Sequence, residues 1–563
     1  MRLPRACDGD CGGQACLAVE RCSVQGELTG GVVAQCVATW RAIARDMSAR
    51  VWGRQGGEGR IQLASMFRKV LIANRGEIAV RVTRTLREMG VRAAAVYSEP
   101  DAGALHVREA DEAYPLGGTT SAESYLRGEK ILDIARAHGV DAIHPGYGFL
   151  SENAGFARAC ADAAVTFIGP TPEAIRAMGD KILAKETMRK AGVPVVPSVE
   201  CHDSDTSEAV TRRAEEVGFP LLVKAAAGGG GKGMRLVRER GDLPAAIEAA
   251  QREAQKAFGD GRVFLEKYID HPRHIEFQIF GDAHGGATHL FERECSIQRR
   301  HQKVIEEAPS AALTPVLREK MGAAAVAAAK AIGYRNAGTV EFIVAPSGEF
   351  YFLEVNTRLQ VEHPVTEMTL LRDLVRAQVE VASGGRLPFR REDLRQHGHA
   401  IECRVYAEDP ARGFLPSVGR LERFIPPSGP GVRVDTGFAE GDEVTTYYDP
   451  MLAKLIVWGE DRSAAIARMK AALRRFVILG VTTNVEFLHD CVAHPVFERG
   501  EADTHFLQTY DVTGKAAPPP DEAYIVAAFA GAGGSEKSSR DGSGRTSVDG
   551  GGNPWRALSG WRG

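Results

Sequence analysis

The chain has 563 residues, enough for roughly three or four domains, and its 44% hydrophobic and 25% charged residues are typical of a globular protein. The net charge of −3 shows no basic excess, so nucleic acid is not an expected partner. The sequence contains no apolar run of about 18 residues, and we expect no membrane span. Five of the ten cysteines fall in the first 36 residues and the others are scattered, which favours reduced thiols in the cytoplasm over a disulfide framework.

Both ends of the chain differ from its middle. Residues 1–65 lack the apolar segment of a secretory signal and carry several acidic residues, unlike a transit peptide. We therefore expect a non-core N-terminal extension, with the folded body beginning at Met66. Residues 511–563 are rich in Pro, Gly and Ser, which predicts a flexible tail.

Short apolar strands and helices alternate from Lys69 onwards. The expected strands are residues 69–74, 91–98, 141–146 and 165–170, and the expected helices are residues 77–90 and 124–139. This β–α–β–α–β order predicts an open parallel sheet with right-handed crossovers. The segment HPGYGFLSENAGFA follows the third strand, where such sheets tend to bind ligands, although its glycines and proline also suit a purely structural turn.

A helix is expected at residues 181–192, followed by a lid-like unit over about 195–268 that contains the glycine run AAAGGGGKG. The run contains G-x-G-x-x-G, but the segment after it looks extended rather than helical, and Gly233 stands where a P-loop has Ser or Thr. Two interpretations stay open. The run is either a flexible hairpin or a flap whose N–H groups close over a polyphosphate, with Lys224 beside it.

The hairpin GTVEFIVAPSGEFYFLEVN carries candidate metal ligands. If Val344 pairs with Glu349, then Glu341 and Glu354 lie on one face of the sheet, together with Asn356. Oxygen ligands of this kind suit magnesium. The alternative is that the two glutamates simply face solvent, and a register slip of one residue would put them on opposite faces.

The segment FLEVNTRLQVEH places polar residues at every second position from Glu354 to Glu362. A straight strand would spread them over roughly 26 Å, at about 3.3 Å per residue, which is too far for one compact site. We therefore predict a bend near residues 359–361. Upstream, CSIQRRHQKVIEEAP concentrates cationic and amide donors, and it forms either a basic surface loop or a cradle for a nucleotide or a small anion.

These motifs, together with EKYIDHPRHIEFQIFGD and HAIECRVYAEDP, resemble biotin carboxylase of the ATP-grasp superfamily from about Met66 to Leu507. The resemblance implies a multidomain fold of the α/β and α+β classes. Its parts would be a Rossmann-like N-terminal domain over residues 66–180, an ATP-grasp domain over 181–395 with a mobile lid at about 195–268, and a β-rich C-terminal domain over 396–510.

The resemblance also assigns residues to a site. The ATP-binding residues that it implies are Lys181, Lys224, Gly230, Gly231, Glu266, Lys267, Ile269, His274, Gln298 and His301. The implied ligands of two Mg²⁺ or Mn²⁺ ions are Glu341, Glu354 and Asn356. The implied bicarbonate pocket consists of Lys303, Arg358, Gln360 and the backbone of Val361. Glu362 would deprotonate bicarbonate, and Arg404 would hold bicarbonate and stabilise the biotin enolate.

The implied activity is ATP-dependent carboxylation of biotin with bicarbonate through carboxyphosphate, the first half-reaction of an acetyl-CoA, propionyl-CoA or methylcrotonyl-CoA carboxylase. In the helix expected at 463–480, Met469 and Lys470 are followed by Ala471, whereas a biotinyl domain has Met-Lys-Met. Biotin is therefore expected on a separate biotin carboxyl carrier protein. The other expected partners are carboxyltransferase subunits and a second copy of this chain.

The sequence leaves two rival functions open. One is another ATP-grasp ligase, such as a carbamoyl-phosphate synthetase or a purine-pathway carboxylase. The other is a catalytically silent nucleotide-binding scaffold subunit, which would be expected to lack a base or a metal ligand. Against the scaffold, the chain retains Glu341, Glu354, Arg358 and Glu362. Near the C-terminus, NPWRALSGWRG resembles the segment that introduces the middle region of longer acyl-CoA carboxylase subunits, which favours an acyl-CoA carboxylase over a pyruvate carboxylase.

Overall fold

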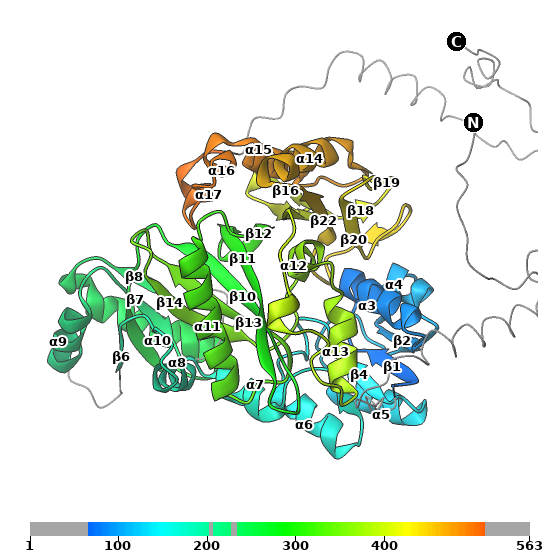
Figure 1. The fold of residues 1–563 in the computed structure, drawn as a ribbon, viewed down its shortest axis with the longest axis horizontal. Coiled ribbons are helices and arrows are strands. Elements are labelled where there is room, and N and C mark those ends of the chain that lie inside the picture. Colours follow the sequence, from blue (N-terminus) through cyan, green and yellow to red (C-terminus); the bar gives the residue numbers. More distant parts are fainter. Residues whose placement is uncertain (1–65, 202–206, 227–233, 513–563) are drawn as a thin grey trace, which may run out of the picture. The chain divides into compact units, whose positions relative to one another are not determined.

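The computed structural model describes residues 66–201, 207–226 and 234–512 (Figure 1). The N-terminal extension, nearly all of the predicted tail, and the lid glycines Gly230 and Gly231 lie outside the described residues. The predictions made for them therefore stay predictions. Within the described ranges, no helix is long and apolar enough to cross a membrane.

The first sheet consists of five parallel strands in the order β3-β2-β1-β4-β5, as the alternating pattern predicted. The strands are β1 (Lys69–Ile72), β2 (Arg92–Tyr97), β3 (Glu112–Pro115), β4 (Ala142–His144) and β5 (Thr166–Phe167). The helices are α3 (Gly76–Glu88), η2 (Glu99–Asp101), α4 (Leu105–Glu109), α5 (Gly128–Ala137), α6 (Ala154–Asp162) and α7 (Pro172–Gly179). Sequence reasoning missed β3, because this short strand is only half-buried and ends in a proline.

The second sheet has eight strands in the order β14-β13-β10-β11-β12-β15-β22-β20. They are β10 (Arg273–Gly281), β11 (Ala287–Arg299), β12 (Gln302–Ala308), β13 (Asn336–Val344), β14 (Phe350–Asn356), β15 (His399–Tyr406), β20 (Val432–Thr436) and β22 (Met451–Gly459). The β-rich part expected from residue 396 continues the same sheet, because β12 pairs with β15. This pairing brings Glu306 and Arg404 together.

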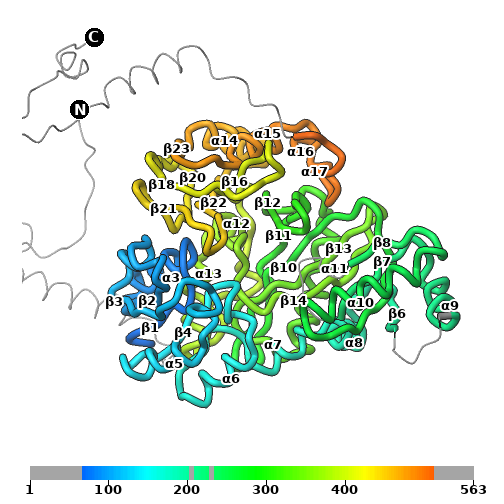
Figure 2. The backbone as a smooth tube through the Cα atoms, turned by 180° about the vertical axis from the view of Figure 1, so that it is seen from behind, coloured from blue at the N-terminus to red at the C-terminus, as the bar shows by residue number. Residues whose placement is uncertain are grey.

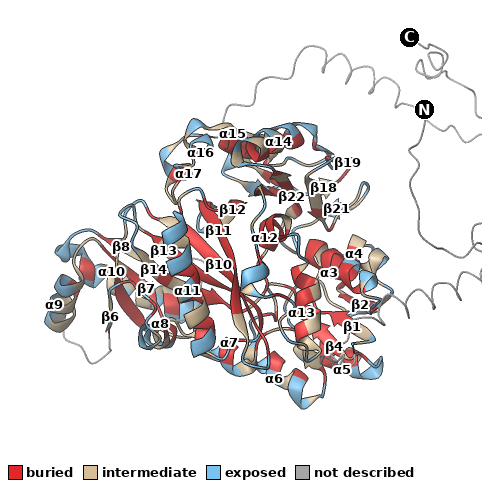
Figure 3. Cartoon of the chain, in the orientation of Figure 1, coloured by how far each residue is buried: buried red, intermediate tan, exposed pale blue. Residues whose placement is uncertain are grey.

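Helices cover both faces of the second sheet. The main ones are α11 (Pro315–Ala331), α12 (His363–Leu370), α13 (Leu374–Ala382) and α14 (Arg462–Arg475). α11 packs against β10 and β11, which are buried along most of their length (Figure 3). The hydroxyl of Thr314 caps α11 by accepting a hydrogen bond from the N–H of Leu317 at 3.2 Å.

The lid is an antiparallel sheet in the order β6-β9-β7-β8 that projects to one side of β10 and β13 (Figure 2). Its elements are α8 (Lys181–Lys190) at its base, β6 (Ser198–Cys201), α9 (Ser207–Val217), β7 (Leu221–Ala225), β8 (Arg235–Val237), η3 (Arg240–Asp242), α10 (Leu243–Phe258) and β9 (Val263–Lys267). The extended segment predicted after the glycine run is β8. A helix at this point is therefore excluded, and with it a dinucleotide fingerprint.

Small elements complete the C-terminal region. They are η4 (Arg391–Asp393), β16 (Glu408–Asp409), η5 (Pro410–Arg412), β17 (Leu415–Pro416), β18 (Gly419–Arg420), β19 (Arg423–Ile425), β21 (Glu443–Val444), β23 (Val477–Leu479), α15 (Val485–Ala493), α16 (Pro495–Glu498) and α17 (Phe506–Thr509). The region has its own apolar core between α14, α15 and the outer face of β15 and β22. This core packs against one face of β15, the strand that carries Arg404, and supports its position.

The register of the β13–β14 hairpin differs from the predicted one. Val344 pairs with Phe350 and not with Glu349, and a β-bulge next to Glu341 shifts the following pairs by one residue. Glu341 therefore lies directly opposite Glu354. A bulge adds one unpaired residue to a strand without changing its alternating composition, so the sequence pattern could not reveal it.

The chain also leaves the sheet earlier than predicted. β14 ends at Asn356, whereas we expected the bend near residues 359–361. The N–H of Thr357 donates to a carboxylate oxygen of Glu152 at 2.9 Å. The turn is thus fixed by a side chain from the loop before α6, about 200 residues away in the sequence.

Candidate active site

A cavity of roughly 920 Å³ lies between the lid, the second sheet and the loops that follow β1 and β4. The predicted site residues that line it are Lys181, Lys224, Glu266, Lys267, Ile269, His274, Gln298, His301, Lys303, Glu341, Glu354, Asn356, Arg358, Gln360, Val361 and Arg404. Glu362 is fully buried behind this lining, in contact with Lys303 and Arg404. The structure therefore brings together every predicted site residue that it describes.

Lys303, on β12, is the centre of a buried charge network. Its ammonium donates to Glu276, to Glu341 at 2.7 Å and to Glu362 at 2.7 Å. Although burial lowers it, the three carboxylates together raise the pKa of Lys303 well above its ordinary value. The side chain is therefore a permanent cation that fixes the positions of three acids.

Glu362 directly precedes α12 and lies between two cations. One of its oxygens accepts from Lys303, and the other accepts from Arg404 at 3.0 Å. Burial opposes ionisation, but Lys303 and Arg404 hold the pKa of Glu362 well below its ordinary value. The carboxylate is consequently ionised at neutral pH.

Arg404, on β15, reaches the cavity beside a second buried glutamate. Its Nε donates to Glu306 on β12 at 2.7 Å. Burial raises the pKa of Glu306 to about 7, because the opposing effect of Arg404 is offset by the charge on Glu362. Two neighbouring carboxylates of one network thus have pKa values shifted in opposite directions.

Arg358 lies just beyond the end of β14. Its Nε donates to Glu152 at 2.9 Å and its Nη1 donates to the side-chain oxygen of Gln360 at 2.9 Å. The carbonyl of Val361 accepts from Lys454 at 2.9 Å, which fixes the backbone between Gln360 and α12. The guanidinium and the amide are thereby held in place beside Lys303, as donors suited to a small oxyanion.

Glu341 and Glu354 offer a place for a divalent cation. Burial raises the pKa of Glu354, and the charge of Glu341 opposite it raises it further. A divalent cation between them would relieve this repulsion, and carboxylate oxygens suit Mg²⁺. The NH₂ group of the Asn356 amide donates to Glu341 at 2.8 Å, and its oxygen accepts from Arg358 at 3.1 Å. It must turn over to offer that oxygen to the same cation.

Two lysines at the base of the lid share one carboxylate. Lys185 on α8 and Lys224 on β7 both donate to Glu266 on β9, and all three side chains are largely buried. The Lys267 ammonium donates to two backbone carbonyl oxygens before β7, each at 3.2 Å. The side chain of Glu266 therefore holds two lysine side chains in position at the base of the lid.

His274 connects the candidate metal ligands to the β11–β12 turn. Gln298 donates to Nδ1 of His274 at 2.9 Å, and Nε2 of His274 lies 2.9 Å from a carboxylate oxygen of Glu341. The turn itself consists of Arg300 and His301, whose φ angles are 50° and 66°. Positive φ at both central residues is the usual geometry of a two-residue hairpin loop, so these angles follow from the pairing of Arg299 with Gln302.

Sequence reasoning missed four acids and bases that hold the site residues in position. They are Glu152, Lys185, Glu276 and Glu306. Arg293, fully buried, completes the set by donating to Glu276 at 2.6 Å. The available signal was a charged residue within an apolar strand, as in EFQIF of β10, because a buried charge has to be paired. The structure is needed to show which partner pairs with it.

The site defines a class of protein. A lid sheet and a larger sheet enclose a cavity. Lysines that could bind phosphate lie near the lid, Glu341 faces Glu354, and the ionised carboxylate of Glu362 lies beside two cations. This is the arrangement of an ATP-grasp enzyme, in which a nucleotide is held between two sheets.

Comparison with known proteins narrows this class. Residues 66–175 match the N-terminal domain of biotin carboxylase, residues 180–390 match the ATP-binding domain of the carbamoyl-phosphate synthase L chain, and residues 402–509 match the C-terminal domain of biotin carboxylase. Biotin carboxylase 1 of Bacillus subtilis is 52% identical over 450 residues, which are 80% of this chain and 100% of that protein. The chain belongs to the biotin carboxylase family.

Solved structures agree with this assignment. The biotin carboxylase domain dimer of the Hydrogenobacter thermophilus 2-oxoglutarate carboxylase, in complex with MgADP, ADP and bicarbonate, matches with a TM-score of 0.77 and 49% identity. The match covers 80% of this chain and 100% of that one. The predicted three-part fold is confirmed, and the protein is a ligase of the biotin carboxylase family.

Longer relatives extend beyond this chain. The mitochondrial alpha subunit of methylcrotonoyl-CoA carboxylase from Dictyostelium discoideum is 51% identical over 464 residues, which are 82% of this chain and 66% of that subunit. The chain thus spans less than two thirds of the length of this relative.

Proposed function

We propose that Glu362 removes the proton of bicarbonate and so starts the reaction. The observation that carries this proposal is its fully buried, ionised carboxylate between Lys303 and Arg404. Bicarbonate is a poor nucleophile until it loses this proton, and a positioned carboxylate can take it. Lys303, Arg358, Gln360 and the backbone of Val361 hold the anion against the base.

The deprotonated oxygen then forms a bond to the γ-phosphorus while the bond from that phosphorus to ADP breaks. The products are ADP and carboxyphosphate, and the proton stays on Glu362. Glu341, Glu354 and Asn356 would hold Mg²⁺, which would neutralise charge on the phosphates. Carboxyphosphate splits into carbon dioxide and phosphate, the phosphate takes the N1′ proton of biotin, and Arg404 pairs with the enolate oxygen as carbon dioxide is attacked.

The nucleotide roles follow from the lid and the β11–β12 turn. We assign the phosphates to Lys181 and Lys224, with Gly230 and Gly231 closing over them. The remaining nucleotide contacts that we propose are Glu266, Lys267, Ile269, His274, Gln298 and His301. The domain limits of 66–180, 181–395 and 396–510 are part of the same proposal.

The wider assembly is a further part of the proposal. The printed name of the Dictyostelium relative supports an acyl-CoA carboxylase, in which this chain charges biotin on a separate carrier protein and a carboxyltransferase uses it. The Hydrogenobacter dimer supports a homodimer. The relatives include mitochondrial subunits and bacterial enzymes, so the predicted cytoplasmic location stays a prediction. Mass spectrometry of proteins co-purified with the tagged chain tests the partners, and the absence of any biotinylated protein would contradict the assembly.

The base is tested with Glu362→Gln, and Glu349→Gln is the matched control because Glu349 is an exposed glutamate on the β13–β14 turn. We expect Glu362→Gln to lose bicarbonate-dependent ATP cleavage by about a hundredfold or more, the usual scale for a general base. ATP binding and the control should be unchanged. Turnover at the wild-type level in Glu362→Gln would refute the role. The same assay with and without free biotin separates this function from another ATP-grasp ligase, which would not respond to biotin.

A further inference from the structure

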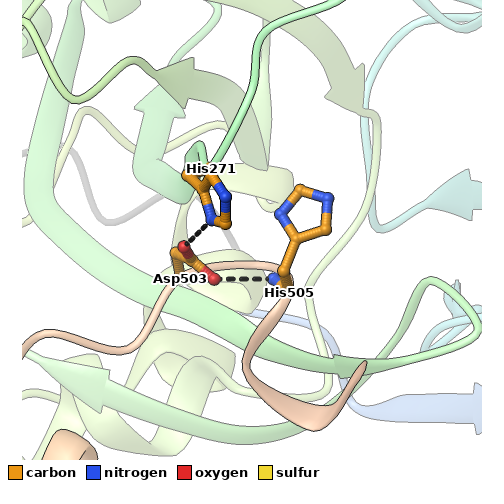
Figure 4. Close-up of side chains that lie close together, drawn as sticks. All are labelled: His271, Asp503 and His505. Atoms are coloured by element: carbon orange, nitrogen blue, oxygen red, sulfur yellow. Dashed lines mark hydrogen bonds and ion pairs between the residues drawn. The ribbon is translucent and has the colours of Figure 1, made fainter. Parts of the chain in front are cut away.

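Three side chains of the types that ligate metals lie close together at the base of the lid, and one of them, His505, lines the cavity (Figure 4). His271 lies in the turn between β9 and β10, while Asp503 and His505 lie just before α17. Nδ1 of His271 is 2.8 Å from a carboxylate oxygen of Asp503, and the two imidazole rings are 5.0 Å apart. One ligand atom from each residue lies within 4.8 Å of the other two.

The backbone holds these residues in place. The N–H of Thr504 donates to the carbonyl of Pro272 at 3.0 Å, which ties the two segments together. The N–H of His505 donates to the second oxygen of Asp503 at 2.8 Å and so fixes the carboxylate. His271 has a φ of 46°, in the left-handed region that non-glycine residues rarely adopt. Strain of this kind is retained where a side chain has to be aimed.

The hydrogen bonds of His505 leave one of its nitrogens for a ligand. The Tyr268 hydroxyl contacts its Nε2 at 2.9 Å. Its Nδ1 is buried and has no hydrogen-bond partner among the described residues. Figure 4 shows the ring nitrogen closest to the backbone of His505 turned toward His271. A metal-binding histidine is usually oriented in this way, by a hydrogen bond at its other nitrogen.

We propose that His271, Asp503 and His505 form a binding site for a transition-metal dication of the Zn²⁺ class. Two imidazoles and one carboxylate suit Zn²⁺ and related ions, which accept nitrogen ligands and four-coordinate geometry with water in the last position. Mg²⁺ is a poor match, because it prefers oxygen ligands. A bound ion would join the turn between β9 and β10 to the C-terminal region. The site is separate from Glu341 and Glu354 and does not depend on the catalytic roles proposed above.

The test is a titration of the full chain with Co²⁺, followed by its visible absorption. The variants are His271→Asn and Asp503→Asn, and His397→Asn is the control because His397 is an exposed histidine elsewhere. We expect the wild type and the control to bind one more Co²⁺ per chain than the two variants. The titration is run at about pH 8, because Asp503 raises the pKa of His271 and protons compete with the metal.

Other Co²⁺ ligands are common to all four proteins and cancel in the comparison. Thiolates in the first 36 residues would add charge-transfer bands that a His and Asp site does not give. Tyr268→Phe keeps all three ligands and should weaken Co²⁺ binding about tenfold. Co²⁺ should also raise the unfolding temperature of the wild type and the control more than that of the variants. Equal Co²⁺ stoichiometry in all four proteins would overturn the proposal, whichever variants fold.

Discussion

Glu306 is a buried carboxyl group whose ionisation lowers the stability of the folded protein. The substitution Glu306→Gln tests this effect. The side chain is fully buried on β12, where it accepts a hydrogen bond from Nε of Arg404 at 2.7 Å. Glutamine has nearly the same shape and keeps an acceptor oxygen for Arg404, but it cannot ionise. The substitution therefore removes a charge and little else.

The expected magnitude follows from the pKa of Glu306, which burial raises from 4.5 to about 7. Between these two values the folded protein binds a proton that the unfolded chain has released, so stability falls as the pH rises through this window. A shift of about 2.5 units corresponds to a loss of at most about 3 kcal/mol by about pH 8. Glutamine resembles the protonated form and avoids the loss.

The assay is thermal unfolding of Glu306→Gln and the wild type at about pH 5 and about pH 8. We expect similar unfolding temperatures at the lower pH and a more stable variant at the higher pH. The control Glu349→Gln should show no such dependence, because Glu349 is exposed. A variant that is equally destabilised at both pH values would refute the reasoning. Biotin-dependent turnover should fall, since Arg404 then has Glu362 as its remaining carboxylate partner in this network.

Three further substitutions test other parts of the site. Arg358→Lys loses the fixed contacts to Glu152 and Gln360 and should raise the bicarbonate KM about tenfold to a hundredfold while leaving the ATP KM unchanged, which steady-state kinetics will show. Glu266→Gln removes the carboxylate shared by two buried lysines; it should lower the free energy of unfolding by about 3 kcal/mol in urea denaturation and weaken ATP binding. Gly281→Ala would place its Cβ 1.9 Å from a backbone carbonyl oxygen, so we expect a loss of about 2–3 kcal/mol in the same denaturation assay, with an unchanged ATP KM in the folded fraction.

The fold was largely predictable because its signals are local. Apolar strands, amphipathic helices and glycine breaks each occupy a few consecutive residues. Most of the first sheet, the extended segment β8 after the glycine run and the β13–β14 hairpin were expected from them. The errors came from non-local geometry. The bulge beside Glu341 and the pairing of Ile305 with Cys403 depend on which strands pair and in which register. The composition of a single strand does not determine either.

Only those residues of the candidate site that lie in recognisable motifs could be predicted from the sequence. Alternation pointed to Glu354 and Glu362, but it suggested one long polar face. The structure instead ends the strand at Asn356 and places Glu362 inside the protein. The buried partners Glu276 and Glu306 lie in strands whose apolar neighbours hide them from any periodic pattern. Their roles arise from contacts between strands that are distant in the sequence.

The charge network explains why this pocket tolerates so many buried carboxylates. Lys303 holds Glu341 and Glu362 at the same distance of 2.7 Å, so a change of charge on either acid alters the field at the other. The cations do not affect all of the acids equally. The pKa values of Glu306 and Glu354 are raised, while that of Glu362 is held low. Opposite shifts within one network give its acids different tasks. Part of the rise in the pKa of Glu306 therefore comes from the charge of the ionised Glu362 near it.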